Sequence, residues 1–191
     1  MAPQHHAAIK HVMPARKAIG KRTIFNLLGP LANPAGTRNQ LIGVFDKQWV
    51  EPIAETLLNL GTKSAWVVHG QDGLDEISTT APTDIAILKE GSIETKTITT
   101  EHFGLESTDL EKLKGGDADE NAAALRAVLE GQKCAYRDIV LANASAVLNI
   151  HGKTDSLEEG AQIAAEEIDN GHAFQILKDY IQFTREVMRD E

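Results

Sequence analysis

The sequence predicts an α/β fold, with a mixed, partly parallel sheet that is flanked by helices. One observation is the order strand, helix, strand: the apolar run 40–45, helically spaced apolar residues from Val50, and a second apolar run at 64–69. Short links in such a unit imply two parallel strands joined by a right-handed crossover. Another is helical periodicity in most of the chain after residue 117. No linker divides the chain, so we expect a single α/β domain over residues 1–191.

Two further strands are expected to form a β-hairpin. Residues 84–89 are mostly apolar, residues 92–98 alternate and are rich in Thr and Ile, and Glu90–Gly91 lies between them as a turn. In the predicted helix from Val50, which lies before these strands, Gly61 is a candidate C-cap. Pro52 fits poorly inside that helix, so its first turn is expected to be short or to begin late.

Four helices are expected in the rest of the chain. Asp117 and Glu120 have the spacing of a capping box, and so do Ser156 and Glu159. Residues 139–150 are almost all apolar or small, which predicts a buried helix. The last helix, from about residue 173, carries a set of residues on one face. These are Leu177, Tyr180, Ile181, Thr184 and Met188.

Composition excludes several classes of protein. The 191 residues include 19 Lys+Arg and 28 Asp+Glu, a formal charge of −9, which argues against a general nucleic-acid or anionic-membrane binder. The single cysteine, Cys134, excludes a disulfide framework. No apolar run approaches the roughly 20 residues that span a bilayer. The first residues have neither a signal-peptide nor a transit-peptide pattern, and we therefore expect a cytoplasmic protein.

The strongest chemical feature is the acidic run Asp72-Gly73-Leu74-Asp75-Glu76, directly after the predicted strand 64–69. Ligands of open α/β sheets gather at the carboxyl ends of strands, and a turn that contains glycine can direct adjacent carboxylates to one point. Carboxylate oxygens suit Mg²⁺, which commonly bridges to a phosphate. The alternative is a solvated acidic turn, which spacing alone favours.

Two other segments have chemical potential. Arg16 lies in a cationic cluster with Lys17, Lys21 and Arg22, and its guanidinium is suited to bidentate recognition of a carboxylate or phosphate. The segment Gly29–Gly36 is expected to be a rigid loop that packs against a substrate or turns a corner. For the cationic cluster the alternative is a solvated basic face, which composition alone favours, and for the loop a simple change of chain direction is the more common role.

Together these segments resemble the anthranilate phosphoribosyltransferase family. The most specific match is the run from Arg22 to Pro34, RTIFNLLGPLANP, and the resemblance extends over essentially the whole chain. Other segments also match the family. They are residues 2–12, 14–35, 72–76, 115–122 and 138–143.

The resemblance implies a fold, an activity and a site. The fold is that of the C-terminal domain of nucleoside phosphorylases and phosphoribosyltransferases. The family transfers phosphoribosyl from phosphoribosyl pyrophosphate to anthranilate with release of pyrophosphate, in tryptophan biosynthesis. By matching positions, Arg16 would hold the anthranilate carboxylate, Asp75 and Glu76 would hold Mg²⁺, and His6 would lie near the substrate channel. Family members are homodimers.

The chain departs from the family in one respect. The family's glycine-rich phosphate-binding loop and Lys-His-Gly-Asn motif are absent from the 191 residues, so the chain resembles the C-terminal portion, with most of the helical N-terminal domain missing. We expect this chain alone to be inactive and to expose apolar surface. The alternatives are a non-catalytic partial domain that binds Mg-pyrophosphate or a protein partner, and an enzyme similar to pyrimidine nucleoside phosphorylase, which the run Arg22–Pro34 fits badly.

Overall fold

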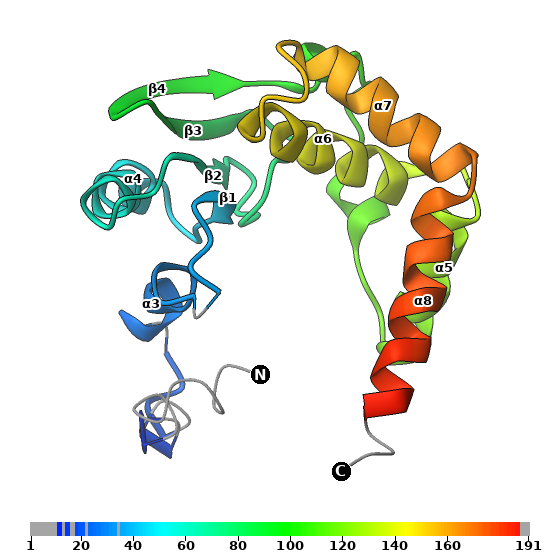
Figure 1. Cartoon of the computed structure of the whole chain (residues 1–191), viewed down its shortest axis with the longest axis horizontal. Helices are drawn as coiled ribbons and strands as arrows, with labels where there is room; N and C mark the ends of the chain where they lie inside the picture. The colour runs from blue at the N-terminus through cyan, green and yellow to red at the C-terminus, as the bar shows by residue number, and fades with distance from the viewer. Residues whose placement is uncertain (1–10, 13, 16–17, 22, 34, 188–191) are drawn as a thin grey trace.

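A four-stranded sheet lies between helices in the structure (Figure 1). This computed structural model describes residues 11–12, 14–15, 18–21, 23–33 and 35–187. The helices and strands are α3 (Phe25–Leu31), β1 (Asn39–Gly43), α4 (Val50–Asn59), β2 (Ser64–Gly70), β3 (Thr83–Lys89), β4 (Ser92–Ile98), α5 (Ala118–Leu129), α6 (Ala135–Ile150), α7 (Leu157–Asp169) and α8 (His172–Val187). Short 3₁₀ helices span Lys47–Trp49, Thr100–Phe103 and Leu110–Leu113.

The sheet is mixed, with the strand order β1-β2-β3-β4. β1 and β2 are parallel, and β2, β3 and β4 follow one another antiparallel, which confirms the predicted parallel pair and the predicted hairpin. Gly43 at the end of β1 lies opposite Val68, while β2 continues to Gly70. The loop that follows β2 therefore starts beyond the end of β1.

Both faces of the sheet are covered at β2. Trp66 and Val68 belong to a core that includes residues of α6 and α7, whereas Ala65 and Val67 belong to a second core that includes residues of α4. This burial on both faces explains why β2 reads as a continuous apolar run rather than an alternating one. In Figure 1, α4 lies on the opposite side of the sheet from α6 and α7.

Local sequence accounts for most element boundaries. Pro52 lies in the first turn of α4, directly after a 3₁₀ turn, where its missing N–H costs no helical hydrogen bond. Glu90 and Gly91 both have positive φ angles, of 51° and 78°, as a tight two-residue hairpin requires. The Asp117 carboxylate accepts from two backbone N–H groups and caps α5 as predicted.

Two boundaries differ from the sequence expectations. The expected loop Gly29–Gly36 begins with helix, because α3 continues to Leu31 with Pro30 inside it. The predicted helix 139–150 starts four residues earlier, at Ala135. The apolar pattern does not indicate this first turn, because it contains Arg137, a charged residue that only the fold buries.

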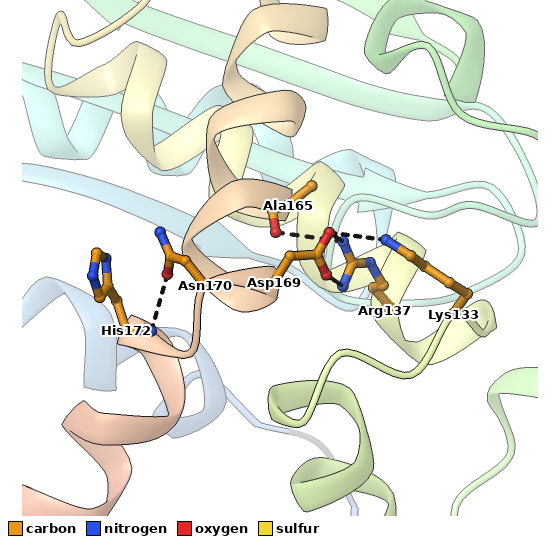
Figure 2. A network of polar contacts seen from close by, with 6 residues as sticks. All are labelled: Lys133, Arg137, Ala165, Asp169, Asn170 and His172. Carbon is orange, nitrogen blue, oxygen red and sulfur yellow. Dashed lines mark hydrogen bonds and ion pairs between the residues drawn. The ribbon is translucent and has the colours of Figure 1, made fainter.

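A charged network joins the start of α6 to the end of α7 (Figure 2). Arg137 is only 2% exposed, and its guanidinium donates to both carboxylate oxygens of Asp169, at 2.6 and 2.9 Å. Lys133 donates to the same carboxylate at 2.9 Å. A buried guanidinium needs such a partner, because leaving its charge unpaired in the interior is costly.

Helix α8 has an exposed apolar stripe. Leu177, Ile181 and Thr184 are half-buried, but Tyr180, expected on the same face, is 65% exposed. The stripe consists of Ile176, Tyr180, Phe183 and Val187. In the described part of the chain no helix, α8 included, is long and apolar enough to cross a membrane. Met188 lies outside the described residues.

We expect the Arg137–Asp169 pair to make stability depend on pH in the acid range. Hydrogen bonds from Arg137 and then from Lys133 lower the pKa of Asp169 from 3.8 to about 2. A depressed carboxyl pKa stabilises the folded state above the unfolded value, so this stabilisation is lost as the pH falls from about 4 through 2. Urea denaturation between pH 2 and 6 measures the loss.

The variant Asp169→Asn is the control for this prediction. At pH 7 it should have a lower urea midpoint than the wild type, because Arg137 stays buried without its charged partner. Its midpoint should then fall less than that of the wild type between pH 4 and 2. Equal acid dependence in the two proteins would contradict this role of the pair.

Candidate functional site

The acidic run lies in the loop between β2 and β3, at the carboxyl ends of the parallel strands β1 and β2. Two backbone hydrogen bonds shape its start: Gly70 N–H donates to Leu74 O at 2.8 Å, and Gln71 N–H donates to Pro82 O at 2.9 Å. The loop therefore turns back on itself next to the sheet. It presents its acidic residues where ligands of α/β sheets bind.

The three carboxylates of this loop have different environments. Asp72 is used within the loop: it accepts from the hydroxyls of Ser78 and Thr80 and from the backbone N–H of Leu74. Partial burial alone would raise its pKa, but these hydrogen bonds together hold the pKa of Asp72 below its usual value. Asp72 thus stabilises the loop.

Asp75 and Glu76 are both exposed and lie next to each other. Although Glu76 is exposed as a residue, neighbouring protein atoms exclude part of the water around its carboxyl, and this desolvation, followed by the negative charges of Asp75 and Asp72, raises the pKa of the Glu76 carboxyl. The repulsion shows a local excess of negative charge that a bound cation would relieve.

The two carboxylates of Asp75 and Glu76 fit Mg²⁺ as part of its ligand set. No group of three or more His, Cys, Asp or Glu residues in the described part of the chain could hold a metal ion. Asp75 and Glu76 thus offer two hard carboxylate ligands and no closed cage. Mg²⁺ is commonly bound by one or two carboxylates, with water and substrate phosphates as the other ligands.

The backbone of Asp75 is placed by its contact with β1. A Cβ atom added at Gly43 would overlap the carbonyl oxygen of Asp75, so no other residue fits there without a shift of the loop. Gly43 does not have a positive φ angle, and its role is therefore the close approach of two backbones. In the sequence Gly43 lies within a predicted strand, and no local pattern indicates this contact.

A second network, which the sequence does not indicate, is centred on Asp84 and holds the start of the acidic loop. Asp84 of β3 is 6% exposed and accepts from Lys47 at 3.0 Å, from Thr97 at 2.9 Å and from Gln71 at 3.2 Å. Burial opposes its ionisation, but these partners lower the pKa of Asp84 below its usual value. The carboxylate thereby joins the loop to β4 and to the turn after β1.

The other predicted site residues, Arg16 and His6, lie outside the described residues. The structure therefore places only the acidic part of the predicted site. Pro34 and Arg22, at the ends of the most specific sequence match, are also outside it.

Comparison with known proteins defines the class to which the chain belongs. The family model described as "Glycosyl transferase family, a/b domain" matches residues 1–174, and the chain is a member of this family. Among curated relatives, the anthranilate phosphoribosyltransferase of Parvibaculum lavamentivorans is 54% identical over 183 residues, which are 96% of this chain and 54% of that protein. That of Rhizobium rhizogenes is 58% identical over 170 residues, 89% of this chain and 50% of that protein. The chain thus spans about half the length of these relatives.

Solved structures agree with this assignment. Anthranilate phosphoribosyltransferase from Thermus thermophilus superposes with a TM-score of 0.86 and 41% identity, over 94% of this chain and 53% of that one. The Saccharomyces cerevisiae enzyme in complex with PRPP and Mg has a TM-score of 0.85 and 29% identity, over 93% of this chain and 51% of that one. The expected fold class is therefore confirmed.

We expect Gly43→Ala to displace the acidic loop. The new methyl group would overlap the Asp75 carbonyl, and such overpacking typically costs about 1–3 kcal/mol. Chemical denaturation measures this cost, and ¹⁵N–¹H spectra should show shifts at Asp75, Glu76 and Ile77.

Gly61→Ala is the matched control. Gly61 has φ of 80°, so alanine is strained there by about 1–2 kcal/mol, but nothing lies within 4 Å of the added Cβ. This variant should lose comparable stability and leave the signals of the acidic loop unchanged. If both variants perturbed the loop equally, the contact at Gly43 would have no specific role.

Proposed function

We propose that this chain provides the metal-binding and anthranilate-binding part of an anthranilate phosphoribosyltransferase, in tryptophan biosynthesis. The reaction would transfer phosphoribosyl from phosphoribosyl pyrophosphate to anthranilate and release pyrophosphate. The observation that carries the proposal is the exposed Asp75–Glu76 pair at the carboxyl ends of β1 and β2. Support comes from relatives of that name and from the yeast enzyme in complex with PRPP and Mg.

In the proposed reaction the amine nitrogen of anthranilate forms a bond to the anomeric carbon while the bond to pyrophosphate oxygen breaks. Asp75 and Glu76 would hold Mg²⁺, which when bound neutralises charge on the diphosphate. Arg16 would bind the anthranilate carboxylate and so orient the amine for attack, and His6 would lie beside the substrate channel. An aromatic amine attacks as a neutral base, so no side chain is needed to deprotonate it first, and the cationic nitrogen formed by the attack then releases its proton to water or to the departing pyrophosphate.

The acidity of the chain affects how the substrates would bind. Both substrates are anions and the chain has a formal charge of −9, so the overall field does not attract them. Binding would depend on Mg²⁺ at the acidic pair and on local cations such as Arg16.

We propose further features of the protein from the family resemblance. The 191 residues form a single α/β unit that corresponds to the C-terminal portion of the enzyme. The full-length enzyme acts as a homodimer in the cytoplasm and binds no nucleic acid.

Calorimetry with pyrophosphate and Mg²⁺ tests the metal site directly. The wild-type chain should bind Mg-pyrophosphate, and Asp75→Asn should weaken binding by about tenfold or more because it removes a ligand charge. Asp155→Asn makes the same change at an exposed residue between α6 and α7, and should bind as the wild type does. Absence of binding by the wild-type chain would contradict a metal-binding role and favour a non-catalytic domain.

We also expect this chain alone to have no transferase activity. The glycine-rich loop and the Lys-His-Gly-Asn motif that bind phosphoribosyl pyrophosphate in the family are absent from the 191 residues. Anthranilate fluorescence, followed with phosphoribosyl pyrophosphate and Mg²⁺, should stay constant with this chain and fall with the full-length Thermus thermophilus relative. A steady loss of fluorescence with the chain alone would disprove this expectation.

A further inference from the structure

We propose that Asn143 of α6 is a positioning residue that sets the orientation of the Asp75–Glu76 pair. Its carboxamide makes a two-way contact with the backbone of Ile77, the residue that follows Glu76. The claim that this pair binds a metal ion rests on the proposed function, but the positioning by Asn143 can be tested without a metal ion.

The carboxamide of Asn143 pairs with the backbone of Ile77 in the way that a neighbouring β-strand would. Ile77 N–H donates to Asn143 Oδ1 at 3.0 Å, and Asn143 Nδ2 donates to Ile77 O at 2.9 Å. The same Nδ2 donates to Ile139 O at 2.9 Å, one turn earlier in α6. The carboxamide is thus held by its own helix and holds the loop in turn.

Both peptide groups that flank Glu76 are fixed by this arrangement. The peptide between Glu76 and Ile77 contains the N–H that Asn143 accepts, and the peptide between Asp75 and Glu76 contains the carbonyl that lies against Gly43. The Ile77 side chain is fully buried in the core under α6. Glu76 therefore has little freedom in its backbone, although its carboxylate is exposed.

Only a carboxamide makes all three hydrogen bonds. It offers an acceptor to Ile77 N–H and donors to the carbonyls of Ile77 and Ile139. A carboxylate keeps the acceptor but has no donor, and it would place negative charge beside two carbonyl oxygens. A leucine of similar size has neither.

The chain offers a matched control on the same helix. Asn149 Nδ2 donates to Thr154 O at 3.1 Å, so it also bonds α6 to the backbone of a loop. That loop precedes α7 and is not the acidic loop. Asn143→Leu and Asn149→Leu therefore remove the same kind of contact at different places, and Asn143→Asp is the conservative variant.

The experiment compares residual dipolar couplings and amide hydrogen exchange in the four proteins. Asn143→Leu should change the couplings of the Glu76 and Ile77 N–H groups and speed exchange at Ile77 about tenfold, as expected for the loss of paired hydrogen bonds. Asn143→Asp should lie between Asn143→Leu and the wild type. Asn149→Leu should leave both amides as in the wild type. Unchanged couplings in Asn143→Leu, or equal changes in Asn149→Leu, would overturn the proposal.

Mn²⁺ with pyrophosphate is the probe for the effect on binding. If the wild-type chain binds it, measured by electron paramagnetic resonance, Asn143→Leu should bind about tenfold more weakly and Asn149→Leu within twofold of the wild type. Equal affinity of Asn143→Leu and the wild type would overturn the proposal. Failure of the wild type to bind would count against the proposed function instead, and the couplings would still decide the role of Asn143.

Discussion

The ion pair between the buried guanidinium of Arg137 and the partly exposed carboxylate of Asp169 is the constraint on which the site-bearing side of the sheet depends. A guanidinium that is 2% exposed has to keep its carboxylate partner, so the first turn of α6 is tied to the last turn of α7. These two helices cover one face of the sheet. Asn143 lies six residues after Arg137 on the same helix, and its side chain holds the acidic loop at Ile77.

The carboxylates of the acidic run 72–76 differ in role because their surroundings differ: Asp72 stabilises the loop, whereas Asp75 and Glu76 are available to a ligand. Asp72 is saturated by hydroxyl and backbone donors, which lower its pKa. Burial and the neighbouring carboxylates act in the opposite direction on Glu76 and raise its pKa. The residue that stabilises the loop and the residues available to a ligand thus differ in their hydrogen-bond partners rather than in their chemical type. Carboxylates exposed in this way and held by a rigid backbone suit a metal ion that shares its ligands with a phosphate.

Much of the fold could be predicted because its signals are local. The turn Glu90–Gly91, the cap at Asp117 and the apolar run of β2 depend on neighbours in sequence, and the structure contains all three. The start of α6 could not be predicted in the same way. Arg137 reads as a surface residue until Asp169, 32 positions later, is placed beside it. By its spacing Tyr180 shares a helical face with Leu177 and Ile181, but packing leaves it exposed.

The sequence by itself determined the family, the order of the elements and the identity of Asp75 and Glu76 as the candidate metal ligands. The order of the elements depends on residue types at short spacing, which a single chain displays directly, whereas the metal role of Asp75 and Glu76 comes from the family resemblance. Only the tertiary structure decided that Gly43 lies under Asp75, that Asp84 gathers Lys47 and Gln71, and that Asn143 holds Ile77 across 66 residues. The physical reason is that a close backbone approach and a two-way hydrogen bond exist only between segments that the completed sheet and its helices have brought together.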